Sequence, residues 1–179
     1  MFKFSIRHLV SLAFGVPIFF LLARFLSVPL YDNAGITLAY AVLALYAIIY
    51  GPIIGLLIGI IGHILVDLTL FMGPSWSWII VGALVGFSHG LIFKPGFIDD
   101  GVFKKPEIMR FMIGSAVIHM VSWTIIAPIL DLVFSSAPAG RAFIQGIVAG
   151  LSNSVTTAIF GTVIIFIYMK ITAKSNKTS

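Results

Sequence analysis

A histidine and an aspartate interrupt the otherwise apolar stretch IGHILVDLT, residues 61–69. His63 and Asp67 are four residues apart, so a helix would place both side chains on one face. Together with His119, this pair would supply the groups of an intramembrane enzyme. Two ligands are too few for a metal site, and no second cluster of ligating residues accompanies them. The sequence therefore predicts no metal and no cofactor, and keeps the enzyme as an alternative.

Arg24 is a second charged residue inside an apolar run. It lies about four residues before the expected helix end at Val28, or roughly 6 Å along the helix axis. Asp67 lies about six residues before the turn at Gly73, or roughly 9 Å from the same side. An arginine stays ionised in a membrane and requires a partner. The similar depth predicts a buried Arg24–Asp67 pair, which would either stabilise the fold or form the floor of a binding site.

The stretch GFSHG, residues 86–90, matches the Gly-x-Ser-x-Gly pattern of serine hydrolases. That motif requires a sharp turn between a strand and a helix, which exposes the serine. Here it lies within a predicted helix, and His89 points about 100° away from Ser88 around the helix axis. A stripe of packing glycines explains the match better. No nucleophile is predicted, and the chain is not expected to be an enzyme.

Polar and aromatic residues gather near one set of predicted helix ends. Tryptophans are typical of membrane interfaces, which suits Trp76 and Trp78, whereas Trp123 lies about nine residues from a helix end. Apolar walls with a few convergent polar groups form small-molecule sites, and flat aromatic rings would suit a flat ligand. The expected ligand-binding residues are Arg24, Asn33, Asp67, Trp76, Trp78, Trp123, Asp131, Gln145 and Asn153.

The composition places these residues in a membrane protein. Of the 179 residues, 60% are hydrophobic and only 9% are charged, and the mean hydropathy is +1.14. A soluble domain has about 25% charged residues, so this chain cannot cover a water-facing surface. No cysteine is present, which excludes disulfides and thiolate metal sites. The expected fold is a single domain, residues 1–179, formed as an all-α bundle of six transmembrane helices.

Apolar runs of about 20 residues can cross the hydrocarbon core, and they delimit the six predicted helices. Gly-Pro at 51–52, GPS at 73–75 and SSAPAG at 135–140 interrupt the apolar runs, and residues 94–107 form one long polar loop. An N-terminal signal peptide is not expected, because Arg24 interrupts the first run and no clear cleavage site follows it. The predicted spans are residues 8–28, 34–50, 52–72, 76–93, 108–132 and 141–171.

The net charge of +5 arises from cations at helix ends, so nucleic acid is not an expected partner. With six spans, nine of the eleven Lys and Arg residues fall on one side, which the positive-inside rule assigns to the cytoplasm. Arg24 inside a span and Arg141 on the opposite side are the other two. Both termini and the 94–107 loop are therefore predicted to be cytoplasmic. The nine cations are Lys3, Arg7, Lys94, Lys104, Lys105, Arg110, Lys170, Lys174 and Lys177.

Glycines recur at four-residue spacing in three of the predicted helices. Small residues in a stripe let helix backbones approach closely, so packing within the bundle is the favoured interpretation. The alternative is that one stripe docks a separate membrane subunit, and Ser11 and Gly15 have the same spacing in the first helix. The glycines are Gly51, Gly55, Gly59, Gly82, Gly86, Gly90, Gly146 and Gly150.

Three stretches of the first four predicted spans carry a resemblance to a known family. They are FFLLARFLSVPL, LALYAIIYGPIIGLLIGIIGHILVDL and GPSWSWIIVGALVGFSHGLI. These stretches resemble the substrate-binding (S) components of energy-coupling factor (ECF) vitamin transporters. The likeness is closest to the riboflavin-type subgroup, which is thought to include cobalamin-specific members. The resemblance extends over all six predicted spans.

The resemblance implies a protein of the prokaryotic plasma membrane that binds a vitamin, cobalamin or riboflavin, with high affinity in an outward-facing pocket. It also implies assembly in the lipid bilayer with a scaffold subunit and two cytoplasmic ATPases, which agrees with the lack of a Walker A loop in this sequence. In the family, small residues of the first helix dock the scaffold. Ser11 and Gly15 are expected there, with Ala13 and Pro17 as an offset pair. A stand-alone secondary transporter is the other alternative.

Overall fold

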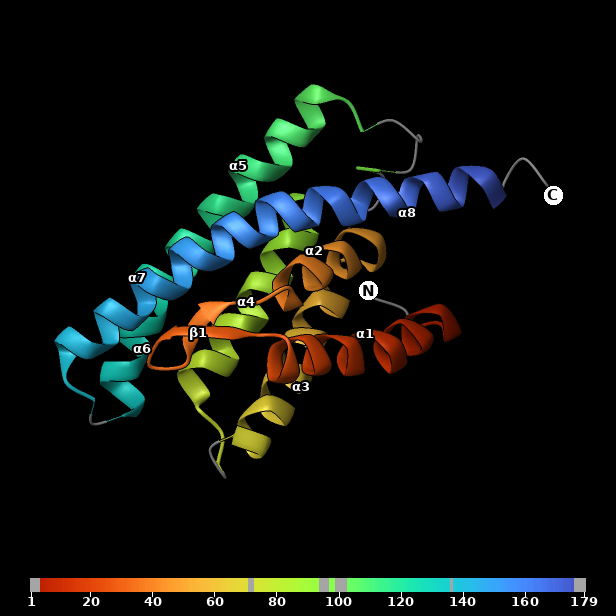
Figure 1. The fold of residues 1–179 in the computed structure, drawn as a ribbon. Helices are drawn as coiled ribbons and strands as arrows, with labels where there is room; N and C mark the ends of the chain where they lie inside the picture. Colours follow the sequence, from red (N-terminus) through yellow and green to blue (C-terminus); the bar gives the residue numbers. More distant parts are fainter. Residues whose placement is uncertain (1–3, 71–72, 94–96, 99–102, 136, 176–179) are drawn as a thin grey trace.

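The computed structural model describes residues 4–70, 73–93, 97–98, 103–135 and 137–175. In this part of the chain, helices form a bundle and one short hairpin joins the first two of them (Figure 1). The elements are α1 (Ile6–Phe25), β1 (Val28–Tyr31), β2 (Ala34–Ile36), α2 (Ala39–Tyr50), α3 (Pro52–Leu70), α4 (Trp76–Ile92), α5 (Lys105–Val121), the π-helical segment η1 (Ser122–Ile126), α6 (Ala127–Phe134), α7 (Ala139–Thr156), the π-helical segment η2 (Thr157–Gly161) and α8 (Thr162–Ser175).

Within the described residues, four helices are long and apolar enough to cross a membrane. They are α1, α3, the continuous helix from α5 through η1 to α6, and the continuous helix from α7 through η2 into α8. The apolar helices α2 and α4 are shorter, with 12 and 17 residues. Large apolar side chains cover the outer surface, as on α1, where Ile6 is 80% exposed and Phe14 is 62% exposed. Such a surface requires lipid, so the chain is a multi-pass membrane protein. The number of six membrane crossings stays a prediction.

The two ends of the described chain lie toward one side of the bundle. Figure 1 shows that α1 begins and α8 ends there, whereas the hairpin and the turn between α6 and α7 lie on the other side. The guanidinium of Arg7 lies 5.5 Å from the ring centre of Tyr50, which places the start of α1 beside the end of α2. The start of α1 and the hairpin therefore lie at opposite ends of the described bundle, and the cytoplasmic position of the termini stays a prediction. Lys3, Lys94 and Lys177 lie outside the described residues.

The hairpin between α1 and α2 corrects the all-α prediction. Residues 34–36, which were expected to begin the second span, form β2 and pair antiparallel with β1. Asp32 and Asn33 form the two-residue turn, with φ angles of 45° and 67°. Two successive residues with positive φ are what a type I′ hairpin turn requires, and Asp and Asn tolerate that conformation better than most residues.

Glycines bring α3 and α4 into backbone contact. A Cβ added at Gly86 would lie 2.5 Å from the carbonyl carbon of Gly55, and one added at Gly59 would lie 2.5 Å from the carbonyl oxygen of Gly82. No side chain fits between these helices at either level. Gly51, with a φ of 93°, ends α2 and lets Pro52 begin α3. The glycine stripes of these two helices therefore pack against each other, as the favoured interpretation predicted.

Small residues of α1 also face the interior, which corrects the expected docking pair. Ser11 is 2% exposed, and its hydroxyl donates to the carbonyl oxygen of His8 at 2.7 Å. Gly15 is buried, and an added Cβ would lie 2.5 Å from the Ile58 side chain. Neither residue is available to another subunit, because small residues serve close packing inside a bundle as well as outside it. The offset residues Ala13 and Pro17 are exposed instead.

The α3–α4 contact predicts a large difference between two Gly→Ala variants. Gly86→Ala places a methyl group against the backbone of Gly55, and such overpacking typically costs about 1–3 kcal/mol. Gly140→Ala is the matched control, because an added Cβ there meets nothing within 4 Å. Thermal unfolding in detergent should show a lower midpoint for Gly86→Ala and an unchanged or higher one for Gly140→Ala. Equal midpoints would contradict the contact.

Candidate functional site

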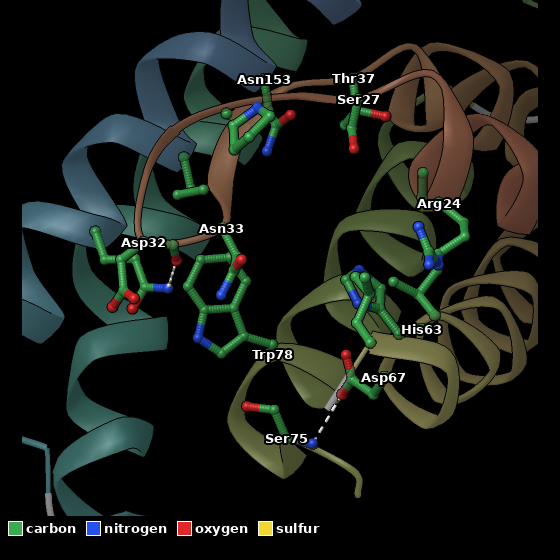
Figure 2. Close-up of a pocket in the computed structure, with 18 of the residues that line it drawn as sticks. Arg24, Ser27, Asp32, Asn33, Thr37, His63, Asp67, Ser75, Trp78 and Asn153 are labelled. Atoms are coloured by element: carbon green, nitrogen blue, oxygen red, sulfur yellow. Dashed lines mark hydrogen bonds between the residues drawn. The ribbon is translucent and has the colours of Figure 1, made fainter. Parts of the chain in front are cut away.

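A cavity of about 620 Å³ lies beneath the hairpin. Its lining comes from the end of α1, the hairpin, α2, the last turns of α3, the start of α4, α6 and α7 (Figure 2). The volume falls within the range of about 300–1,000 Å³ typical of small-molecule sites. The wall is mixed, with apolar residues such as Phe19 and Val66 between several polar and charged side chains. The site therefore has the form of a pocket for a compact organic ligand.

The hairpin is fixed over the cavity by α7. The guanidinium of Arg141 donates two hydrogen bonds to the Asp32 carboxylate, at 2.5 and 2.6 Å. The side-chain amide of Gln145 donates to the backbone carbonyl of Asp32 at 2.5 Å, and Ser152 donates to the carbonyl of Gly35 at 2.9 Å. The Arg141 hydrogen bond lowers the pKa of Asp32 below its ordinary value of 3.8. The carboxylate is therefore charged near neutral pH and ties the roof of the cavity to α7.

An indole ring and a carboxylate form one side of the cavity. Trp78 lines it, and its ring N–H donates to Asp131 at 3.3 Å. The hydroxyl of Ser77 donates to the other oxygen of Asp131. Trp123 is fully buried behind Trp78, with the two ring centres 4.9 Å apart. Asp131 is thus supplied with two donors, and Trp78 is held in place by a hydrogen bond and by a second indole ring.

Trp76 does not line the cavity, although the sequence placed it there. Its side chain is 53% exposed, whereas its neighbour Ser77 is buried. Trp76 and Trp78 are two residues apart, so on a helix they point in widely different directions. Trp76 suits the interfacial aromatic role instead.

Arg24, His63 and Asp67 lie on the opposite wall (Figure 2). Asp67 accepts a hydrogen bond from the backbone N–H of Ser75 at 2.7 Å, and His63 Nε2 shares one with the Tyr40 hydroxyl at 2.5 Å. Arg24 lies over the ring of Phe25, 5.1 Å from its centre. Among the described residues Arg24 forms no ion pair, so the predicted direct Arg24–Asp67 pair is wrong. Both residues line one cavity, but similar depth along two helices did not bring their side chains into contact.

Asn153 is the lining residue with a buried side-chain atom that has no hydrogen-bond partner within the described chain. The side chain is 4% exposed, and its Oδ1 atom is buried without a hydrogen bond. It extends from α7 into the cavity lining beneath the hairpin (Figure 2). Asn33 also lines the cavity, from the exposed tip of the hairpin. The cavity therefore combines residues whose hydrogen bonds are satisfied with others that are free to meet a ligand.

The structure separates the three residues of the alternative enzyme. His63 lines the cavity, whereas His119 is fully buried behind Trp123 and receives the indole N–H of that residue at 3.2 Å. The second nitrogen of His119 bonds to the Thr157 hydroxyl at 3.0 Å. Both nitrogens of His119 are thus engaged away from Asp67. These residues form no catalytic constellation.

Several lining residues were not predicted from the sequence. Asp32 was overlooked because its function depends on the turn, although Asp-Asn between two short extended runs was a usable signal. Tyr40 and Thr37 follow the hairpin and enter the lining only because α2 begins later than expected. The further unpredicted polar lining residues are Ser27, Ser75, Ser135 and Arg141, whereas His63 was expected only as part of the alternative enzyme.

Comparison with known proteins gives a consistent result. A family model for the S component of ECF-type riboflavin transporters matches residues 3–170. A UPF0397 protein of Clostridium perfringens is 40% identical, and the match covers 94% of this chain and 91% of that protein. A UPF0397 protein of Exiguobacterium is 38% identical, with 94% and 92% covered. The UPF0397 protein YdcD of Lactococcus lactis is also 38% identical, with 96% and 94% covered.

The clamp between Asp32 and Arg141 predicts a pH-dependent effect. Because the pKa of Asp32 is lowered in the folded protein, the clamp contributes stability above the ordinary value of 3.8 and loses it as the pH falls through the lowered value. Arg141→Gln should unfold at a lower temperature than the wild type at pH 7, and the difference should vanish in acid. Arg110→Gln, at the other end of the molecule, controls for the loss of one cation. A difference that persists in acid would contradict the clamp.

Proposed function

The chain belongs to the family of S components of ECF-type riboflavin transporters, and from this premise we propose that it captures a vitamin for uptake into the cell. The family is one of transport subunits in the membrane rather than of enzymes. The observation that supports vitamin capture in this chain is the cavity of about 620 Å³ beneath the hairpin. Its lining includes Trp78, Arg24 and Asn153, and among the described residues Arg24 has no ion pair and Asn153 Oδ1 has no hydrogen bond.

The ligand proposed is flat and carries polar groups at its edges. Trp78 supplies a fixed aromatic surface, and the polar residues on the walls can meet substituents around a ring. Riboflavin is of drug size, and the cavity volume of about 620 Å³ is in the range typical of sites for such ligands. Cobalamin is several times larger and would extend beyond the cavity. Riboflavin is therefore the first ligand to test, and cobalamin the second.

The proposed orientation has the cavity outside and both termini in the cytoplasm. The cations Arg7, Lys105, Arg110 and Lys170 lie on helices near their ends remote from the hairpin. The positive-inside rule assigns that side to the cytoplasm. The hairpin and its cavity would then face the outside, where a ligand is captured before uptake.

The proposed partners are a membrane scaffold and two cytoplasmic ATPases, which would supply the energy for release and transport. The sequence has no Walker A loop, so ATP hydrolysis of that kind must come from another chain. On α1 the surface available to a scaffold is the exposed face that carries Ala13, Phe14 and Pro17. We propose this face in place of the buried residues Ser11 and Gly15.

Binding and transport can be tested separately with purified components. Tryptophan fluorescence titration with riboflavin, cobalamin and other vitamins should give a saturable response. Trp78→Ala should weaken the binding about 10-fold or more, because ring stacking contributes roughly 1–3 kcal/mol. Trp76→Ala, at the exposed neighbouring tryptophan, should leave the affinity unchanged.

Reconstituted vesicles provide the second part of this test. Uptake should require the scaffold and the ATPases together with ATP. Uptake by this chain alone, without ATP, would reject the S-component mechanism in favour of a stand-alone transporter. Absence of a response to every vitamin tested would reject the cavity as the site.

Cysteine labelling can test the orientation without background, since the chain contains no cysteine. In intact cells an impermeant thiol reagent should label Asn33→Cys, which lies at the exposed tip of the hairpin. The same reagent should label Ser175→Cys only after the membrane is permeabilised. The reverse pattern would place the cavity on the cytoplasmic side and overturn the proposed orientation.

A further inference from the structure

His119 is a fully buried histidine that lies outside the cavity. Its Nδ1 atom accepts a hydrogen bond from the indole N–H of Trp123 at 3.2 Å, and its Nε2 atom shares one with the Thr157 hydroxyl at 3.0 Å. An indole N–H can only donate, so Nδ1 carries no proton and the proton of the neutral ring lies on Nε2. The imidazole therefore accepts from η1 with one nitrogen and donates to η2 with the other.

Trp123 supports three rings of the cavity wall from behind. Its ring centre lies 4.9 Å from that of Trp78, 5.5 Å from that of Tyr40 and 6.3 Å from that of His63. These three residues line the cavity, whereas Trp123 is fully buried and does not. Trp78 and His63 lie on opposite walls (Figure 2). A rotation of this one indole ring would therefore change both walls.

The orientation of Trp123 depends on an acceptor for its N–H. The ring is buried in a helix long and apolar enough to cross the membrane, where water is not available as another partner. The backbone carbonyls of a helix are occupied by the hydrogen bonds of the helix itself. A buried indole N–H without an acceptor is costly, so loss of the imidazole nitrogen would favour a different orientation of the ring.

We infer that His119 is a positioning residue for the ligand. Through Trp123 it fixes how Trp78 and His63 face each other, and thereby the shape of the cavity that receives a flat ligand. An apolar side chain at this position could fill the same space but would offer no acceptor. This inference rests on the proposed function and extends the control of binding to a layer beneath the cavity.

Two amide variants separate the two hydrogen bonds of the imidazole. An asparagine amide can take the place of Nδ1, and a glutamine amide the place of Nε2. His119→Asn therefore keeps an acceptor for Trp123, whereas His119→Gln keeps a partner for Thr157. With riboflavin as the probe, His119→Asn should bind within about 2-fold of the wild type, and His119→Gln about 5- to 30-fold more weakly.

Thr157→Val is the matched control, because it breaks the other hydrogen bond of the same imidazole. It should unfold at a lower temperature in detergent, as both amide variants should, and it should keep the affinity for riboflavin. Trp123→Phe removes the ring N–H that His119 accepts. In that background His119→Asn and His119→Gln should bind riboflavin equally.

The indole N–H signals of the ligand-free protein give a readout that a general loss of stability would not produce. The chain has three tryptophans, so a proton–nitrogen correlation spectrum in detergent contains three such signals, which single Phe substitutions assign. The Trp78 signal should move in His119→Gln and stay in place in His119→Asn. The signal of Trp76, which is exposed, should stay in place in both.

An unmoved Trp78 signal in His119→Gln would overturn the inference, whether or not riboflavin binds. Equal affinities of the two amide variants for riboflavin would also overturn it, while binding by the wild type would leave the proposed function standing. No riboflavin binding by the wild type would reject that ligand and this inference together.

Discussion

Backbone contact between α3 and α4 is the constraint on which the cavity depends. Gly55 and Gly86 allow the two helices to touch, and Gly82 leaves the space that the His63 ring occupies, since an added Cβ would lie 2.7 Å from His63 Nε2. With its helix in this position, His63 meets the Tyr40 hydroxyl and forms part of the cavity wall. In a membrane no difference in hydrophobicity drives two apolar helices together, so this close packing must hold them. Side chains on either glycine stripe would move the cavity wall as well as weaken the bundle.

The sequence predicted features that depend on composition and on short-range geometry. Apolar length located the helices, and Gly51 with Pro52 marked the break between α2 and α3 within one residue. It did not predict features that depend on the lateral positions of helices. Arg24 and Asp67 have similar depths, but depth gives no distance across the bundle. The outward position of Trp76 could have been predicted from helical periodicity alone, because residues two apart do not share a face.

Most polar groups of the site form hydrogen bonds with other groups of the protein. Asp131 receives two side-chain donors, Asp67 receives a backbone N–H, and Asp32 is held by Arg141. Such networks fix the positions of the walls and leave little to rearrange when a ligand enters. The polar groups of the lining that have no hydrogen bond within the protein then determine which ligand is recognised. A site built like this combines a rigid frame with few points of contact that need to match the ligand.

The two π-helical segments keep one series of side chains on the inner side of each long helix. In an α-helix, each step of four residues turns about 40° more than one full turn, so after five steps the last residue would face nearly the opposite way from the first. The helix that contains η1 nevertheless buries such a series without interruption. Its members are Phe111, Ser115, His119, Trp123, Ala127 and Asp131. The wider turn of η1 takes up part of the accumulated rotation, and η2 does the same for the series from Ala149 to Met169. Because the wider turn of each segment holds about one residue more than an α-helical turn, deleting one residue within η1 or η2 would restore α-helical geometry and leave the faces beyond it in place. Deleting one residue in the α-helical part before either segment would rotate everything beyond the deletion by about 100°, turning Asp131 or the inner face of α8 toward the lipid.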